Sequence, residues 1–279
     1  MDVGGQAVIE GVMMKNGPRL SVAVRLPNGR IKLKKEKYDS VVNRYKSLKW
    51  PFLRGIIYLF EMLIIGMKTL TWSADQQMGE GEQPLKTSEL VLTFVLAFAL
   101  TILIFIALPF FLSSYIDPSR GFLFNALDGF FRFAFFVGYV SVIGMMEDVK
   151  RLFQYHGAEH KAVNCYEAKL PLTVKNAKKF TTIHPRCGTS FIVIVILLSI
   201  VLFTFITTPV WYYKFFARIL LIPVIAGISY ELLKLSAKFT KHPIVAMLIY
   251  PGLAMQKITT KEPDDKQLAV ALRAIKAVL

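Results

Sequence analysis

The residues best suited to chemistry lie together in the segment His156-Gly157-Ala158-Glu159-His160. On a helix, side chains four positions apart share one face, so His156 and His160 would point the same way, with Glu159 beside them. Neutral imidazoles are common metal ligands, and a nearby carboxylate can take a proton from a coordinated water. The order His-x-x-Glu-His is also the inverted-zincin signature. The segment therefore predicts a divalent metal site, with zinc the expected ion and Glu159 the general base.

A second dense group, His184-Pro185-Arg186-Cys187-Gly188-Thr189-Ser190, follows shortly after. Its proline and glycine predict a tight turn with fixed side-chain directions. We expect His184 or Cys187 to complete a tetrahedral ligand set. Glu231 competes for that role, because inverted zincins take their third ligand from a distant downstream glutamate. Four further residues could have a place in the site, namely Glu10, Glu147, Asp148 and Arg186.

Each of these assignments has a non-metal alternative. The histidine pair could contact lipid headgroups, form an ordinary pair on a helix surface, or act in acid–base chemistry without metal. Cys187 could be a small buried apolar residue, and Cys165 is the weakest ligand candidate because it lies off the helical face of His160. Several basic residues are typical of a surface that faces anionic lipid: Lys161, Lys175, Lys178, Lys179 and Arg186.

The composition indicates a membrane protein. The chain has 279 residues, of which 54% are hydrophobic, and a formal net charge of +15. Soluble domains are seldom so apolar and so basic together, whereas bilayer proteins with Lys/Arg-rich cytosolic loops commonly are. Asp2 and Glu10 argue against a signal peptide, and two cysteines are too few for a disulfide framework. No RNA-binding motif accompanies the charge, so nucleic acid is not an expected partner.

The chain contains apolar segments long enough to cross a bilayer, at 89–113, 122–146, 189–208 and 214–235. Basic residues concentrate in segment 148–188 and in both terminal regions. The only basic residue in the short connectors 114–121 and 209–213 is Arg120. The positive-inside rule therefore predicts that both termini and segment 148–188 lie in the cytosol, and that the basic segments face anionic headgroups.

The remaining segments predict a small β element and surface helices. Residues 1–48 are β-rich, and Asn28-Gly29 predicts a hairpin. Residues 49–88 predict an interfacial or re-entrant helix with an acidic linker, because a full span would bury Glu61 in the bilayer. Residues 237–279 predict an interfacial segment followed by an amphipathic helix, whose apolar stripe ends at Leu279.

The predicted fold class is an all-α polytopic membrane protein with about four transmembrane helices. Interfacial or re-entrant helices and a small cytosolic β-hairpin element at the N-terminus complete it. The expected order is the β-rich element at 1–48, the surface helix and linker at 49–88, a first transmembrane pair at 89–147, a His/Cys-containing cytosolic loop at 148–188, a second transmembrane pair at 189–236, and the surface helices at 237–279.

Three motifs together suggest a family. The segments 4–14 (Gly-Gly-Gln-Ala-Val-Ile-Glu-Gly-Val-Met-Met), 156–161 and 184–190 resemble the uncharacterised YqhQ-like family of bacterial membrane proteins. The resemblance covers nearly the whole chain and implies a multi-pass protein of the bacterial cytoplasmic membrane. Members of this family of unknown function are sometimes described as predicted metal-dependent enzymes. The similarity to inverted zincins is confined to five residues and one glutamate, so it implies no shared fold.

Three classes of function fit these observations. The first is a metal-dependent hydrolase that acts on a lipid-linked or membrane-embedded substrate at the cytosolic surface. The second is a non-catalytic membrane partner that docks another complex, such as machinery for membrane-protein biogenesis. The third is a transporter that uses the intramembrane charges Asp128, Arg132 and Glu231. About four spans without an internal repeat are few for a transporter, because many transporter folds are built from such repeats. The sequence does not indicate an oligomeric state.

Overall fold

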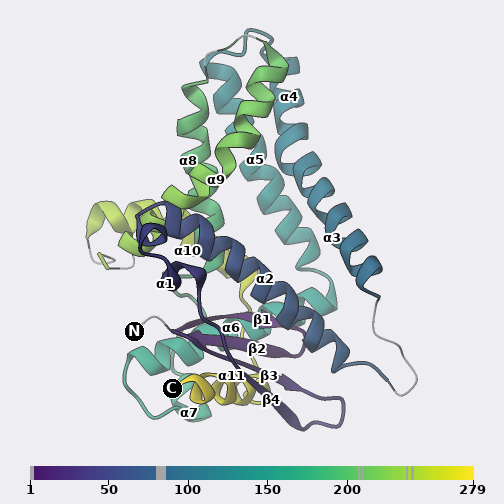
Figure 1. The fold of residues 1–279 in the computed structure, drawn as a ribbon, viewed down its shortest axis with the longest axis vertical. Coiled ribbons are helices and arrows are strands. Elements are labelled where there is room, and N and C mark those ends of the chain that lie inside the picture. Colours follow the sequence, from purple (N-terminus) through teal and green to yellow (C-terminus); the bar gives the residue numbers. More distant parts are fainter. Residues whose placement is uncertain (1–2, 80–85, 207, 209, 237, 240–241) are drawn as a thin grey trace.

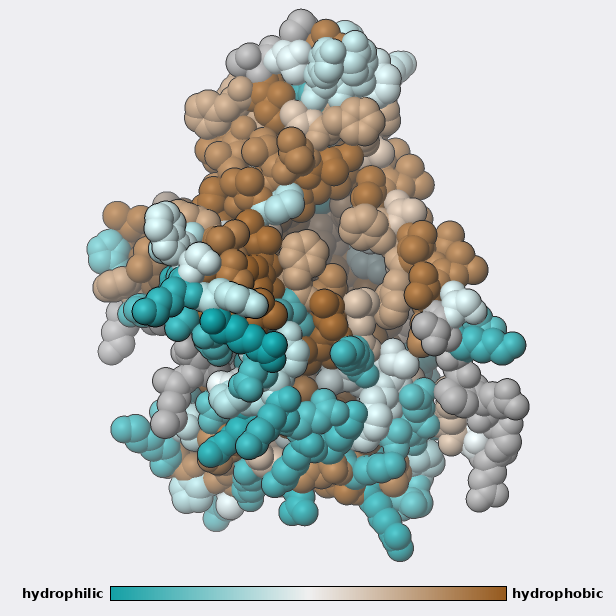
Figure 2. Space-filling view, in the orientation of Figure 1, coloured by the Kyte–Doolittle hydropathy of each residue, from teal (hydrophilic) through white to brown (hydrophobic). Residues whose placement is uncertain are grey.

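The computed structural model describes residues 3–279 except 80–85, 207, 209, 237 and 240–241. It has two parts, a bundle of long apolar helices and a cap that consists of a β-sheet with helices on both faces (Figure 1). Both ends of the described chain lie in the cap. Figure 2 shows hydrophobic side chains over most of the bundle and hydrophilic side chains over the cap.

The cap contains a four-stranded antiparallel sheet in the order β1-β2-β3-β4. Its strands are β1 (Gly4–Val8), β2 (Gly11–Asn16), β3 (Arg19–Arg25) and β4 (Ile31–Lys37). The expected hairpin joins β3 to β4, and Gly29 adopts a φ of 81° in its turn. The small N-terminal β element is therefore confirmed, but it has four strands, because the glycine-punctuated opening segment forms a second hairpin.

Successive side chains along a strand point to opposite faces of the sheet, and both faces of this sheet carry buried apolar side chains. On one face, Val12, Met14 and Ala23 pack against α6 (Glu147–Glu167) and α11 (Asp265–Val278). On the other face, Met13 and Val22 share a cluster with Ile65 of α2 (Leu53–Asp75). A sheet that is covered on both faces buries its apolar residues without a membrane. The cap also includes α1 (Val41–Arg44), a 3₁₀ turn (Lys46–Lys49) and α7 (Val174–Ala177).

The bundle begins with one continuous helix made of α3 (Thr87–Ile102), a π-helical turn (Leu103–Ala107) and α4 (Leu108–Ile116). It continues with α5 (Phe122–Ile143), α8 (Gly188–Thr204), α9 (Trp211–Ser236) and α10 (Pro243–Thr259). Three of the helices in the described chain are long and apolar enough to cross a membrane, at Ser88–Ile116, Phe122–Ile143 and Trp211–Ser236.

The expected third span corresponds to a shorter helix. α8 has 17 residues, or about 25 Å at 1.5 Å per residue, which is less than the ~30 Å hydrocarbon core of a bilayer. Its neighbour α10, expected as a short surface segment, has the same length and packs closely against it. At the contact, Gly252 of α10 meets Ser190 of α8, and a Cβ at Gly252 would lie 2.9 Å from that serine.

Two other expectations concern the segments after the second span. Segment 148–188, the expected connection with His156 and His160 on a helix, contains most of α6, and Glu147 and Asp148 lie in the first turn of that helix, where acidic residues are favourable. Helix α11 is amphipathic as predicted, with Leu268, Leu272 and Ile275 buried, but Leu279 lies beyond its last residue and is exposed. Part of the expected acidic linker, including Glu80 and Glu82, lies outside the described residues.

Charged residues inside the bundle contact one another. The Oδ2 atom of Asp128 lies 3.0 Å from Nε of Arg132 and 2.8 Å from Nη1 of Arg218. Arg218 also donates to Asn125 and lies over the rings of Phe110, Phe124 and Phe203. Asp128 thus contacts two guanidinium groups, that of Arg132 four residues along α5 and that of Arg218 from α9.

Candidate metal centre

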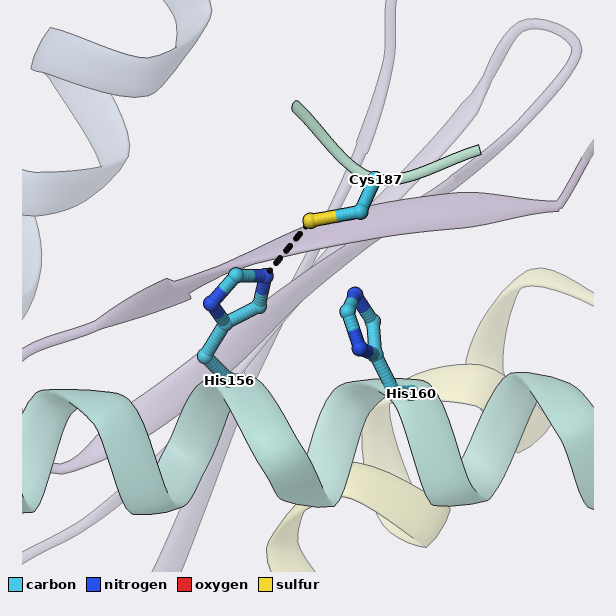
Figure 3. A group of neighbouring side chains, drawn as sticks. All are labelled: His156, His160 and Cys187. Carbon is cyan, nitrogen blue, oxygen red and sulfur yellow. Dashed lines mark hydrogen bonds between the residues drawn. The ribbon is translucent and has the colours of Figure 1, made fainter. Parts of the chain in front are cut away.

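Helix α6 presents His156 and His160 on one face, and the turn before α8 brings Cys187 opposite them (Figure 3). One ligand atom from each of the three residues lies within 4.8 Å of the others. The Nε2 atom of His156 is 3.3 Å from Sγ of Cys187, and the two imidazole centroids are 4.5 Å apart. We call these three residues the metal group.

Backbone carbonyls hold both imidazoles in one tautomer. The Nδ1 atom of His156 lies 2.9 Å from the carbonyl oxygen of Thr259, and that of His160 lies 2.5 Å from the carbonyl oxygen of Thr182. A carbonyl can only accept a hydrogen bond, so each Nδ1 must carry the proton. Each neutral ring then has its lone pair on Nε2. This is how metal-binding histidines are oriented in proteins.

Cys187 is the N-cap residue of α8. Its sulfur accepts from the backbone N–H of Thr189 at 3.3 Å. The sulfur therefore lies at the positive end of the helix dipole, and cysteine sulfur is a common zinc ligand. The position of Cys187 therefore suits a ligand better than an inert apolar residue.

Two close approaches between segments create this geometry. At Gly157, a Cβ would lie 2.1 Å from the carbonyl oxygen of Lys261, so only glycine lets α6 approach the segment that carries Thr259. Gln256 of α10 accepts from the His184 N–H at 2.8 Å and donates to the His184 carbonyl at 2.9 Å. These two bonds fix the turn that carries Cys187.

Glu159 lies beside the metal group. Its side chain is buried, and Oε2 is 3.5 Å from Nε2 of His160. Gly5 of β1 packs closely against it, since a Cβ at Gly5 would lie 3.2 Å from Cγ of Glu159. The glycine-rich opening segment thus contributes to the site through this close approach.

His184 is near the metal group but its nitrogens are engaged elsewhere. Its Nε2 lies 3.3 Å from the Glu167 carboxylate, and its Nδ1 accepts from the Arg186 N–H at 3.3 Å. Burial lowers the pKa of His184, and the charge of Glu159 partly opposes that effect. Arg186 forms an ion pair with the same Glu167 carboxylate. Both candidates in this turn lie near the histidine pair: the Cys187 sulfur is 3.3 Å from Nε2 of His156, and the ring centroid of His184 is 5.7 Å from that of His160. Only Cys187 directs a ligand atom into the metal group of the described chain.

The structure places the other carboxylate candidates in different interactions. Both oxygens of Glu231 accept from the guanidinium of Arg54, at 2.6 and 2.5 Å. Glu10 pairs with Arg151 and accepts from the Tyr155 hydroxyl, and burial and the Glu10 charge raise the pKa of Tyr155 well above its usual range. The remaining two, Glu147 and Asp148, are exposed in the first turn of α6.

Lys161 was expected on a lipid-facing surface, but it is buried in the cap. Its ammonium donates to Glu262 at 2.5 Å and to the Lys178 carbonyl at 3.2 Å. Cys165 is also buried, which raises the pKa of its thiol, and it lies away from the metal group against Pro171. Both residues are therefore part of the cap interior.

A cavity of about 560 Å³ adjoins the metal group at the junction of cap and bundle. Sequence reasoning missed most of its polar lining, because these residues come from separate elements and share no motif. They are Lys15 of β2, Ser40 and Asn43 near α1, Tyr58 of α2, and Tyr230 and Lys234 of α9. His156, Glu159, His160, His184, Arg186 and Cys187 line the same cavity.

Comparison with known proteins agrees with the sequence motifs. Residues 50–279 match a family model described as protein of unknown function (DUF1385). Over 293 aligned residues the chain is 35% identical to the uncharacterized protein YqhQ of Bacillus subtilis (strain 168), and the alignment covers 99% of this chain and 92% of that protein. No solved structure matches the chain.

Proposed function

The chain belongs to the YqhQ-like, DUF1385 family of unknown function, and we propose that it is a metal-dependent hydrolase acting on a membrane-associated substrate. One observation carries this proposal. Both histidine Nδ1 atoms are hydrogen-bonded to backbone carbonyls, so in the neutral form of each ring Nε2 is the nitrogen that can bind a metal beside the sulfur of Cys187. A His₂Cys set supplies three of the four positions of tetrahedral zinc, as in catalytic zinc sites, which leave one position for water or substrate.

Glu159 is the proposed general base. Zinc held by His156, His160 and Cys187 would lower the pKa of a coordinated water. Glu159, buried and 3.5 Å from Nε2 of His160, would accept the proton of the attacking water and return it to the leaving group. The water oxygen forms the new bond as the bond to the leaving group breaks, so the reaction is a hydrolysis.

The membrane association of the substrate is proposed from the position of the cavity. The cavity lies where the cap meets α2 and α9, and α9 is one of the helices long enough to cross a membrane. The basic residues of segment 148–188 and of both terminal regions favour a cytosolic cap. We therefore place the site at the inner surface of a bacterial cytoplasmic membrane.

The test is the metal content of detergent-purified protein, measured by elemental mass spectrometry. We expect about one zinc per chain in the wild type and in Glu159→Gln, and loss of zinc in a folded His156→Ala/His160→Ala variant. Wild type with zinc would then be compared with Glu159→Gln for hydrolysis of lipid-linked substrates. We expect only the wild type to be active.

Absence of metal from wild-type protein purified without chelator would contradict this proposal. It would favour the alternative of a non-catalytic partner that docks another membrane complex. Loss of zinc in Glu159→Gln would instead make Glu159 a ligand or a structural residue.

A further inference from the structure

We infer that the cavity beside the metal group binds a phosphate group, carried on a lipid headgroup or present as free phosphate, through Lys15 and Lys234. This inference rests on the proposed function, because it gives the class of substrate that the same site would take. Lys15 comes from β2 in the cap and Lys234 from the end of α9 in the bundle, and both line the cavity that His156, Glu159 and His160 also line.

Neither ammonium group forms an ion pair with a carboxylate among the residues that the structure describes. Lys15 donates to the backbone carbonyl of Gly17 at 2.7 Å. Lys234 interacts electrostatically with Glu231, but that carboxylate is itself paired with Arg54. The carboxylates nearby are already engaged. Glu61 accepts from the Val41 N–H at 2.7 Å, and Glu231 pairs with Arg54.

Burial lowers the pKa of Lys15, and the charge of Glu61 only partly opposes this effect. A half-buried ammonium without a contacting anion is stabilised when an anion enters its site. The cavity therefore favours an anionic ligand near Lys15, and the exposed Lys234 adds a second positive charge to the lining.

The rest of the polar lining suits phosphate. Phosphate oxygens accept strong hydrogen bonds, and ammonium, amide and hydroxyl groups donate them. Besides the two lysines, the lining offers the amide of Asn43 and the hydroxyls of Ser40 and Tyr58. A phosphate held by these donors would lie in the same cavity as Glu159.

The distance of Lys234 along α9 suits contact with a lipid headgroup. It lies about 35 Å along α9 from the first residue of that helix, which is just beyond the ~30 Å hydrocarbon core. Helix α2, whose Tyr58 lines the cavity, also exposes Phe60, Leu63 and Ile64 to the surroundings. A cavity of about 560 Å³ can hold a headgroup while the acyl chains stay outside, against such apolar side chains.

The experiment measures binding by full-length Glu159→Gln protein in detergent, so that no probe is turned over. The probe is a fluorescent short-chain phosphatidic acid, and its control is the matching diacylglycerol, which lacks the phosphate. Lys15→Gln and Lys234→Gln should each raise the Kd for phosphatidic acid about tenfold, as expected for loss of one charged hydrogen bond. The control Lys276→Gln removes an exposed lysine of α11 and should leave the Kd unchanged.

Competition by inorganic phosphate identifies the source of the ligand. Displacement of the probe only at phosphate concentrations far above the probe Kd supports a lipid-borne phosphate, and displacement at equal concentration supports free phosphate. Equal binding of the diacylglycerol, or unchanged Kd values in both lysine variants with native elution and circular dichroism, would overturn the inference.

The same titration on the His156→Ala/His160→Ala protein separates this inference from the proposed function. Lysine-dependent phosphate binding by this variant would show that the phosphate site does not require zinc. The same binding by wild-type protein that contains no zinc would support the phosphate site and contradict the metal centre. If the zinc content is normal and neither lysine substitution changes the Kd, the hydrolase proposal stands and the phosphate site is overturned.

Discussion

The backbone carbonyls of Thr259 and Thr182 determine which nitrogens of His156 and His160 are available. Each carbonyl accepts from an Nδ1–H and leaves the Nε2 lone pair beside Cys187. Neither threonine can be recognised as part of the site from its own side chain, because the contact is made by the main chain. The chemistry proposed for the histidines thus depends on how closely other segments approach α6.

Gly157→Ala tests that close approach. The new Cβ would lie 2.1 Å from the carbonyl oxygen of Lys261 and 3.1 Å from the Thr182 side chain, so α6 must move away from both carbonyl-bearing segments. We expect a loss of ~1–3 kcal/mol in the free energy of unfolding and a reduced zinc content. Chemical denaturation and elemental analysis measure the two effects. Gly188→Ala is the matched control, because open space surrounds its Cβ position. Equal stability of the two variants would contradict this account of Gly157.

At the scale of elements, the position of α9 against α2 explains why Glu231 is not in the metal group. Gly55 of α2 packs against Tyr230, and Gly227 packs against Phe52, which brings Arg54 next to Glu231. The two side chains form a two-bond ion pair that is mostly shielded from solvent. Such a pair orients the carboxylate toward α2.

Glu231→Gln should therefore retain about one zinc per chain while it destabilises the contact between α2 and α9. The expected loss is ~1–2 kcal/mol, near the lower end for hydrogen bonds between charged groups, because the pair is partly exposed. Zinc content and unfolding in denaturant are measured together. Loss of zinc with normal stability would make Glu231 a ligand and would contradict this assignment.

The contact between α5 and α9 depends on Asp128, the acidic residue shared by Arg132 and Arg218. Asp128→Asn would leave two buried guanidinium groups without their anion, and we expect a loss of ~3–5 kcal/mol in unfolding free energy. The control Glu36→Gln removes an exposed carboxylate that pairs with Lys34 on β4 and should change stability little. If Asp128→Asn loses no more unfolding free energy than that control, this account of Asp128 is wrong, and the aromatic rings around Arg218 suffice to stabilise its charge.

At the scale of the whole molecule, the cap and the bundle enclose the site between them. The cap supplies His156, Glu159, His160 and Lys15, and the bundle supplies Lys234 and the N-terminus of α8 with Cys187. The N-terminal sheet and α11 pack together, so both ends of the described chain lie at the same end of the molecule (Figure 1).

The proposed orientation is tested by thiol labelling. A cysteine at Ser119, exposed in the connector between α4 and α5, should react with a membrane-impermeant reagent in intact cells. A cysteine at Lys276, exposed on α11, should react only after the cells are permeabilised. The native cysteines Cys165 and Cys187 are buried and should give little background. The reverse pattern would place the cap and the site on the outer side.

The sequence by itself determined the features that depend on local pattern. Four-residue spacing placed His156 and His160 on one helical face, and the apolar stripe of α11 was recognised from Leu268, Leu272 and Ile275. The lengths of three apolar helices and the hairpin at Gly29 followed from composition and turn chemistry. The family was recognised for the same reason, since its motifs are short contiguous segments.

Only the tertiary structure decided the features that depend on contacts between distant segments. It brings the Cys187 sulfur together with the nitrogens of His156 and His160, whereas the ring of His184 lies beside His160 with its Nε2 near Glu167, and Glu231 pairs with Arg54. Contacts between distant segments also bury Lys161 against Glu262 and bring Lys15 and Lys234 to the lining of one cavity. These contacts join residues that are far apart along the chain, and no local pattern specifies their packing.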